Sequence, residues 1–269
     1  MKNSSKASQI FLSLLLTSSL LFATDAKAQS KNDIIINNQW AANSIKVDGK
    51  LDEWGDSLQN FNENTDFSYN LKNNQGMLYL AIKSHNKQNL NRIIARGISF
   101  SFNTEGKKKQ GETLIFPVFD RVSTEKKPVK TVSGTEQTRQ EYDQLLSRIS
   151  RLFITGFSDI KDGPISLNNT YGISAAAGFD KQGHLTIEVA VPFEQLQITN
   201  KDTQLACLIE INGIKQARST YDPNRNSRNS RYGYPNRDYG YDRRPAVDKQ
   251  TLATGFWVKS TLAKQPESL

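Results

Sequence analysis

Short runs in which every second residue is apolar recur along most of this chain, and they constrain its fold more than any other feature. In 66–72, Phe67, Tyr69 and Leu71 alternate with polar residues, and 77–83 repeats the pattern after an Asn- and Gly-containing turn. The same pattern predicts further strands at 33–37, 44–47, 98–103, 113–118, 152–157, 171–179, 185–191, 205–211 and 252–259. Many short strands separated by turns predict a mainly β protein, a two-sheet antiparallel β-sandwich.

Helical periodicity is scarce. The segment 134–150 carries an apolar stripe that includes Tyr142, Leu145 and Leu146, while charged residues occupy the rest of its surface. This pattern predicts one surface helix at about 134–150. A second, shorter helix is expected at 89–96, between two strands.

The segment 215–249 differs from the rest of the chain in composition. It holds nine Lys and Arg residues against four Asp, so most of the formal net charge of +8 is concentrated there. It contains almost no aliphatic residues, so burial cannot offset the entropy lost on ordering it. We therefore expect a long disordered insertion loop between the strands at 205–211 and 252–259.

Aromatic and basic residues alternate within this loop, and Arg228, Arg231, Tyr232 and Tyr234 are its candidate contact residues. Such interleaving suits acidic glycans, a protein partner at the cell envelope, or nucleic acid. Nucleic acid is not an expected partner, because the N-terminal sequence predicts an exported protein and such proteins seldom meet it.

The first 28 residues have the composition of a signal peptide. Lys2 and Lys6 precede an apolar run at 10–22, and Ala26-Lys27-Ala28 forms a small-residue cleavage site. The apolar run is too short to span a membrane, and no cysteine lies near the cleavage site to accept a lipid. We expect an exported, periplasmic or secreted protein that does not span the membrane. Residues 29–269 would form a single domain with its core at about 44–259.

Two segments carry more specific signals. The stretch 45–54 contains the Asp48-Gly49 pair, which supplies the positive φ of a tight turn, and ends with Asp52-Glu53-Trp54. The stretch 185–193 is a strand, Leu-Thr-Ile-Glu-Val-Ala-Val, that ends at Pro192-Phe193.

Together, these two segments resemble the markers of the family 9 carbohydrate-binding modules and related DOMON-like sandwiches, as found in exported proteins of Bacteroidetes type. The resemblance covers about 44–259 and rests on turns, core strands and a strand-ending proline. It implies a β-sandwich and, for function, the binding of a polysaccharide or a cell-envelope glycan.

Sugar recognition needs aromatic rings that stack on the C–H face of a sugar, together with polar side chains for its hydroxyls. The candidate ligand-binding residues outside the loop are Trp257, Trp54, Tyr79 and Tyr171. Tyr79 has the outward parity of its strand, whereas Trp54 is also expected as a core residue that follows the turn. Trp257 alternates with apolar neighbours, which leaves one of its faces available.

Few residues of the sequence suit the binding of a cofactor. No cofactor is required by the pattern, but Asp48, Asp52 and Asp56 crowd a turn in a way that suits Ca²⁺, with a solvated acidic turn as the alternative. Cys207 has the parity of a small buried residue. His85 and His184 are far apart in the sequence, so neither a zinc site nor a catalytic histidine is predicted.

The sequence thus predicts a non-enzymatic, exported carbohydrate-binding-like module whose ligand is unknown. The alternative is an envelope scaffold or interaction protein that contacts acidic glycan or a protein partner through the loop at 215–249. The oligomeric state is not predicted by any of these patterns.

Overall fold

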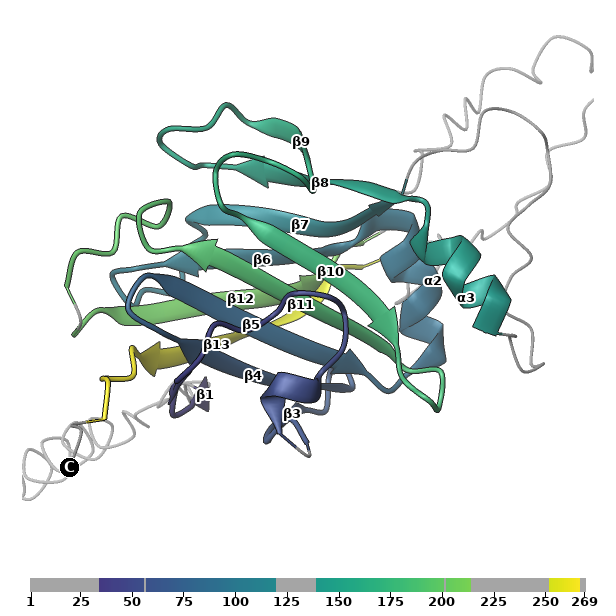
Figure 1. Ribbon diagram of the computed structural model, residues 1–269, viewed down its shortest axis with the longest axis horizontal. Coiled ribbons are helices and arrows are strands. Elements are labelled where there is room, and N and C mark those ends of the chain that lie inside the picture. Colours follow the sequence, from purple (N-terminus) through teal and green to yellow (C-terminus); the bar gives the residue numbers. More distant parts are fainter. Residues whose placement is uncertain (1–33, 56, 120–138, 201, 214–251, 267–269) are drawn as a thin grey trace, which may run out of the picture. The chain divides into compact units, whose positions relative to one another are not determined.

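A computed structural model describes residues 34–55, 57–119, 139–200, 202–213 and 252–266 as a mainly β structure of two sheets (Figure 1). The seven-stranded sheet A has the order β1 (Ile34–Ile35), β13 (Thr254–Thr261), β12 (Gln204–Ile211), β6 (Ile98–Asn103), β7 (Glu112–Phe119), β8 (Ile149–Thr155) and β9 (Gly163–Ser166). The six-stranded sheet B has the order β10 (Ser174–Phe179), β11 (Leu185–Pro192), β5 (Met77–Ser84), β4 (Phe67–Asn73) and β2 (Gln39–Trp40), with β3 (Asn60–Asn62) also paired to β4. The predicted two-sheet sandwich is confirmed.

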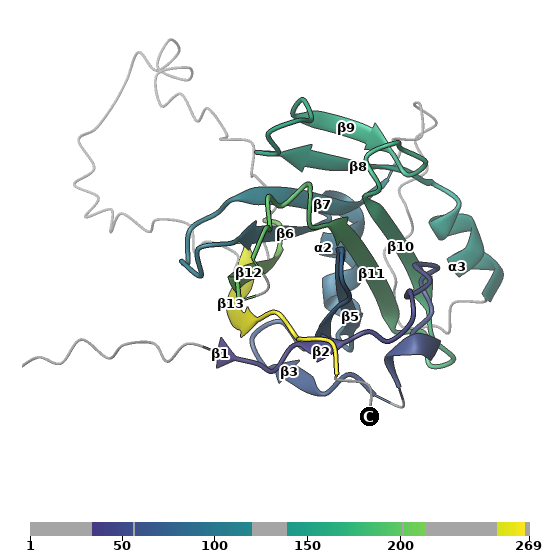
Figure 2. The same ribbon diagram turned by 60° about the vertical axis from the view of Figure 1, so that its left-hand side comes forward.

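Most strand pairs are antiparallel, as predicted; β1 with β13 and β2 with β4 are parallel. Figure 2 shows the two sheets facing each other, and the inward side chains of both sheets form one core. Phe67 and Tyr69 of β4 and Phe100 and Phe102 of β6 are almost fully buried in it. Cys207 is a free, fully buried thiol of the same core, as its parity predicts, and burial raises the pKa of that thiol.

The helices differ in part from the prediction. Helix α3 (Arg139–Leu146) lies within the expected 134–150, but residues 134–138 lie outside the described part of the chain. The helix ends early because Ile149 already belongs to β8, where the two-residue alternation pairs with β7. Helix α2 (Lys87–Arg96) is capped by the Asn86 side chain and contacts β5, β7 and β12, so it closes one end of the sandwich.

The strand expected at 44–47 is not formed. This segment instead crosses the outer face of sheet B and buries Ile45 against it, in a second apolar cluster. The short 3₁₀ helix η1 (Asp52–Trp54) then brings Trp54 into the same cluster. The loop at 215–249 lies outside the described residues. Among those described, no helix is both long and apolar enough to cross a membrane.

The two marker segments of the sequence meet at a single buried carboxylate, that of Glu188 in β11. One oxygen accepts the Trp54 indole N–H at 2.7 Å, and the other accepts the backbone N–H groups of Asp48 and Gly49 at 3.0 and 2.8 Å. Thr186 donates from the same strand to the Gly49 carbonyl at 2.6 Å. Burial raises the pKa of Glu188, and the three donors partly oppose that rise.

Gly49 is required at this turn for two reasons. Its φ is +84°, a conformation that side chains with a Cβ rarely adopt. A Cβ there would also lie 2.5 Å from the carbonyl carbon of Ala177 in β10. The turn is therefore pressed against the edge of sheet B rather than joining two strands in a hairpin.

We predict that Glu188→Gln destabilises the protein by about 1–3 kcal/mol, because an amide nitrogen must then face an N–H donor in a buried site. Urea unfolding at pH 7 measures this difference. Glu210→Gln is the control, since Glu210 is a half-exposed glutamate of β12. Equal stability of the Glu188→Gln and Glu210→Gln proteins would contradict this role.

Candidate functional site

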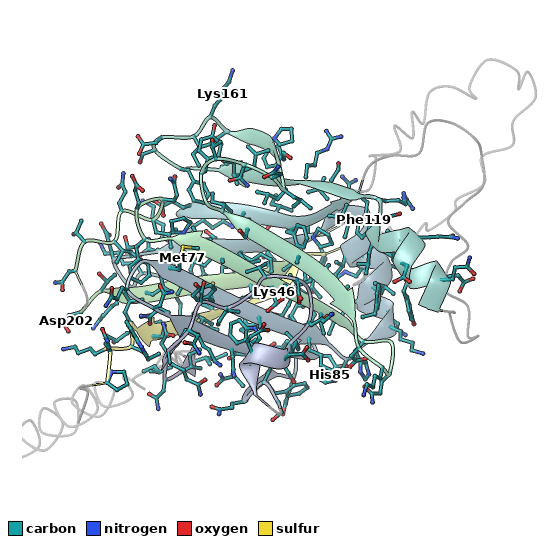
Figure 3. The ribbon with its side chains drawn as sticks, viewed as in Figure 1. Lys46, Met77, His85, Phe119, Lys161 and Asp202 are labelled. Atoms are coloured by element: carbon teal, nitrogen blue, oxygen red, sulfur yellow. The ribbon has the colours of Figure 1, made fainter. Side chains whose placement is uncertain are left out.

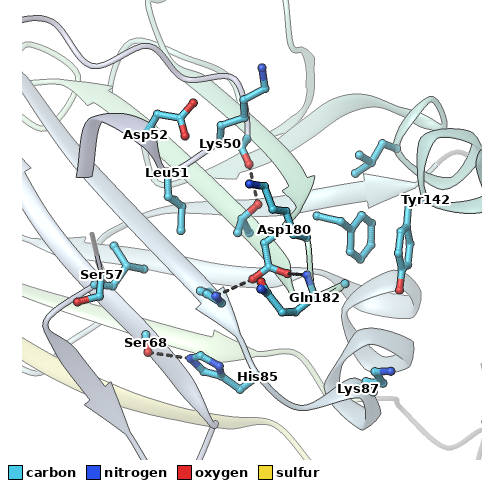
Figure 4. A pocket seen from close by; sticks show the side chains of 18 of the residues that line it. Lys50, Leu51, Asp52, Ser57, Ser68, His85, Lys87, Tyr142, Asp180 and Gln182 are labelled. Atoms are coloured by element: carbon cyan, nitrogen blue, oxygen red, sulfur yellow. Dashed lines mark hydrogen bonds and ion pairs between the residues drawn. The ribbon is translucent and has the colours of Figure 1, made fainter. Parts of the chain in front are cut away.

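A groove of about 1120 Å³ opens on the outer face of sheet B, beside the Asp48-Gly49 turn (Figure 4). The segment from Gly49 to Leu58 forms one wall, and α3 together with the turn between β10 and β11 forms the other. The ends of β4, β5 and β11 provide its floor. Its lining side chains include the polar residues Lys50, Asp52, Ser57, Ser68, Lys83, His85, Lys87, Asp180 and Gln182.

His85 lines one end of this groove, and His184, the other histidine of the chain, contacts it there. His85 follows β5 and His184 precedes β11, and because β5 pairs with β11 their rings meet edge to face, with centroids 5.2 Å apart. The two residues are far apart in the sequence, and only the pairing of these strands brings them together. Figure 3 shows His85 and Met77 at opposite ends of β5. The histidine pair therefore lies at the end of sheet B that is away from Met77.

The Asp180 carboxylate links two of the strands that form the floor of the groove at this end. Its Oδ2 atom lies 2.6 Å from the Lys83 ammonium and 3.0 Å from the His184 Nδ1 atom. Its Oδ1 atom accepts the backbone N–H groups of Gln182 and His184. Burial alone would raise the pKa of Asp180, but hydrogen bonds from Lys83 and His184 outweigh it and lower that pKa to about 2.

His85 is held on its other side by β4. Its Nε2 atom lies 2.8 Å from the Ser68 hydroxyl, and the Phe61 ring packs edge-on with centroids 6.0 Å apart. Burial lowers the pKa of His85, and the charges of His184 and Lys83 lower it further, against a smaller opposing effect from Asp66 and Asp180. His85 is therefore mainly neutral at pH 7.

An aromatic pair forms the α3 side of the groove. Tyr142 stacks on Phe179 with a centroid separation of 4.0 Å and an interplanar angle of 17°. Gly183 permits this position, because a Cβ at that residue would lie 2.5 Å from the tyrosine hydroxyl oxygen. The groove thus combines an aromatic edge with hydrogen-bonding and charged side chains.

Two of the predicted sugar-contacting residues are not available to a ligand. Trp54 is 4% exposed and Tyr79 is 2% exposed. Tyr79 does face outward from sheet B as predicted, but the segment 41–58 covers it, and its hydroxyl bonds to the Asn74 side chain. Trp54 is the core residue that the sequence analysis had also considered, with the Lys72 ammonium 5.2 Å from the centre of its ring.

The other two aromatic candidates lie away from the groove and from each other. Trp257 is half-buried on β13 of sheet A, with both neighbours in the central core, so it faces the opposite side of the sandwich. Tyr171 is 38% exposed and precedes β10, whereas Phe179 ends it. The length of β10 separates them by roughly 17 Å at ~3.3 Å per residue.

The remaining predicted residues are tested only in part. Arg228, Arg231, Tyr232 and Tyr234 lie outside the described residues, as does Asp56 of the proposed calcium turn. Asp48 pairs with Lys46 at 2.8 Å and accepts the Lys50 backbone N–H. Within the described ranges, no group of three His, Cys, Asp or Glu residues is placed to hold a metal ion.

The chain matches no protein-family model, no curated protein and no solved structure in the comparisons made with them.

Among the residues that line this groove, the sequence analysis had proposed only Asp52 as a site residue, in the calcium turn. The segment 180–184 carries one usable signal, because an aspartate followed by a glycine three residues later is typical of a hairpin turn. That signal would have paired β10 with β11. The adjacency of β11 and β5, which brings His184 to His85, depends on the order of strands in the sheet and has no local signature.

We predict that Asp180 stabilises the protein most at pH values above about 4. Its pKa in the folded protein, about 2, lies below the ordinary value of 3.8, so this contribution is lost as the pH falls through 2. Asp180→Asn keeps an oxygen for the turn but loses the charge. The difference in unfolding free energy between wild type and Asp180→Asn, measured by urea titration from pH 6 to pH 2, should shrink on acidification. A difference that is constant or grows would refute the assignment.

Proposed function

We propose that this protein is an exported, non-enzymatic glycan-binding module and that the groove on sheet B is its ligand site. The observation that carries this proposal is the combination, in one open groove, of the stacked Tyr142–Phe179 pair with polar side chains from three directions. A sugar ring presents a C–H face and a rim of hydroxyls. In this groove the aromatic pair can stack on the C–H face, and the polar side chains can form hydrogen bonds with the hydroxyls.

The resemblance to family 9 carbohydrate-binding modules supports the proposal only at the level of the scaffold. Its markers, the turn at Asp48-Gly49 and the strand around Glu188, are used internally to attach one segment to sheet B. Recognition would then depend on residues near these markers but not part of them. No cofactor is needed for this mode of binding.

The alternative site is the basic segment at 215–249, through which the protein would act as an envelope scaffold. The two proposals differ in their response to deletion of 215–249 and to salt. Binding through the groove should survive deletion of 215–249, depend weakly on salt, and be equal in Ca²⁺ and in chelator. Binding through the basic segment should be lost on deletion and weaken steeply as salt screens the arginines.

The hydrogen bond between Ser68 and His85 favours a second function, the hydrolysis of acyl esters. The serine oxygen would attack the acyl carbon while His85 accepts its proton and passes it to the leaving alcohol. Water, deprotonated by His85, would then attack the acyl-serine, release the acid and restore the serine hydroxyl. Release of nitrophenol from p-nitrophenyl acetate by wild type and Ser68→Ala tests this function. A rate that falls to the buffer background in Ser68→Ala would replace the binding proposal with an esterase.

We predict that Tyr142→Ala weakens binding of the strongest ligand on a glycan array about 5- to 10-fold, because a stacked aromatic contributes about 1 kcal/mol. Tyr142→Phe keeps the ring and should bind within about 2-fold of wild type. Isothermal titration calorimetry measures both.

Trp257→Ala is the matched control, since Trp257 faces the opposite side of the sandwich. It should bind as wild type does. Loss of binding in Trp257→Ala with retention in Tyr142→Ala would move the site to sheet A.

A further inference from the structure

Phe61 is a large apolar side chain that stands largely in solvent beside the groove. It is 53% exposed and lies in β3, directly opposite Ser68 of β4. Side chains opposite each other in an antiparallel pair lie on the same face of a sheet, so Phe61 is on the face that carries the groove. Its ring contacts the ring of His85, which lines the groove. The groove therefore has an exposed aromatic ring on its β3 side.

The groove runs across the strands of sheet B, because the covering segment that forms its wall does so. At one end of this wall, Gly49 accepts a hydrogen bond from Thr186 of β11 and lies against the backbone of β10. Further along the wall, the carbonyl of Glu53 accepts a hydrogen bond from Lys72 of β4. The wall thus passes from β10 to β4, and the groove beside it extends from the β10 side of the sheet towards β3.

A row of hydrogen-bonding side chains on the floor follows the same direction. Phe61, Ser68, Lys83 and Thr186 are in register on β3, β4, β5 and β11. The last three of these residues line the groove. The ammonium of Lys83 carries more than one N–H donor, so its bond to Asp180 leaves it able to donate to a ligand hydroxyl. Polar groups thus connect Phe61 with the β10 side of the groove.

The stacked Tyr142–Phe179 pair lies at that other side, since Phe179 ends β10. Figure 4 shows Tyr142 and Ser68, the neighbour of Phe61, on opposite sides of the groove. Four strand spacings of ~4.8 Å separate β3 from β10, which gives roughly 19 Å between the two aromatic surfaces. A 1→4-linked pyranose extends a chain by about one strand spacing, so about four units are needed to reach both surfaces.

The charges of the groove nearly cancel, which suits an uncharged chain of hydroxyl-bearing rings. Lysines and aspartates alternate around it, and four of the first kind face three of the second: Lys50, Lys83, Lys87 and Lys181 against Asp52, Asp143 and Asp180. Charged side chains on both sides of the groove can donate hydrogen bonds to sugar hydroxyls or accept them.

We infer that the groove binds a linear, neutral oligosaccharide of about four or more units, with Phe61 as a second stacking surface opposite the Tyr142–Phe179 pair. The inference rests on the proposed glycan-binding function and names the class of glycan and a further specificity-determining residue. A disaccharide stacks on one aromatic surface at a time, whereas a longer chain stacks on both and crosses the polar row between them. Affinity should therefore depend on the length of the chain.

The test uses linear 1→4-linked oligosaccharides of glucose, xylose and mannose with two, three, four and six units, each titrated into the whole protein by calorimetry. For the sugar that binds, we expect the tetramer to bind about 10-fold more tightly than the dimer, because a second stacked ring and the polar row are then engaged. The hexamer should bind within about 2-fold of the tetramer, since the added units extend beyond both aromatic surfaces.

Variants identify the second aromatic surface. Phe61→Ala and Tyr142→Ala should each weaken binding of the tetramer about 5- to 10-fold, because each removes one stacking contact. At most one of the two variants should weaken binding of the dimer. Phe61→Tyr keeps an aromatic ring and should bind the tetramer within about 2-fold of wild type. Ile35→Ala is the matched control, since Ile35 is an exposed apolar residue of sheet A, and it should bind as wild type does.

The outcomes separate this inference from the proposal on which it rests. If dimer and hexamer bind equally, the long site is overturned while glycan binding stands. If affinity rises with chain length but Phe61→Ala binds the tetramer as wild type does, Phe61 is not the second surface and the inference fails. If no sugar of the panel binds at any length, both the inference and the proposed function are overturned.

Discussion

The Glu188 carboxylate is the contact on which the groove and the outer layer of this protein depend. It receives the Trp54 indole and two backbone N–H groups of the turn at Asp48-Gly49, so one side chain in the middle of a strand fixes a segment about 140 residues earlier. Burial opposes ionisation, and the three donors compensate only in part, as the raised pKa of Glu188 indicates. Such a site tolerates few substitutes, because an apolar residue would leave three donors unpaired.

The same contact creates the groove. Without it, the segment 41–58 would keep its apolar contacts with Tyr79, Ala81 and Ala190 and the hydrogen bonds that Thr186 and Lys72 donate to its carbonyl groups, but it would lose its three bonds to the buried carboxylate. With it, the segment stops short of the sheet end where Ser68, Lys83 and Thr186 lie side by side in register on β4, β5 and β11. The groove is the space that the covering segment leaves open at that end, bounded on the far side by α3.

The sequence predicts the parts of this structure that local physics determines. The alternation in 66–72 and 77–83 gives the β4–β5 hairpin and its inward face, and the parity of Cys207 gives its burial. The strand at 44–47 fails because alternation marks a half-buried segment equally well when that segment lies on a sheet without pairing to it. Tyr79 fails for the complementary reason, since outward parity does not imply exposure when another segment covers that face. The meeting of His85 with His184 needed the strand order, which no local pattern encodes.

Stability and recognition are assigned to different residues of the same sheet face. Glu188 and Trp54 lie under the covering segment and are nearly inaccessible, whereas Asp180, His85 and Lys83 lie at the open end and contribute little to either apolar cluster. On β11, Thr186 is in register with Lys83, and Glu188 is the next residue on the same face of the strand. The ionisable residues can therefore vary in charge, or be replaced by amides of similar size, while the turn, the covering segment and the central core keep their contacts. A scaffold arranged in this way permits its binding specificity to change without loss of the fold.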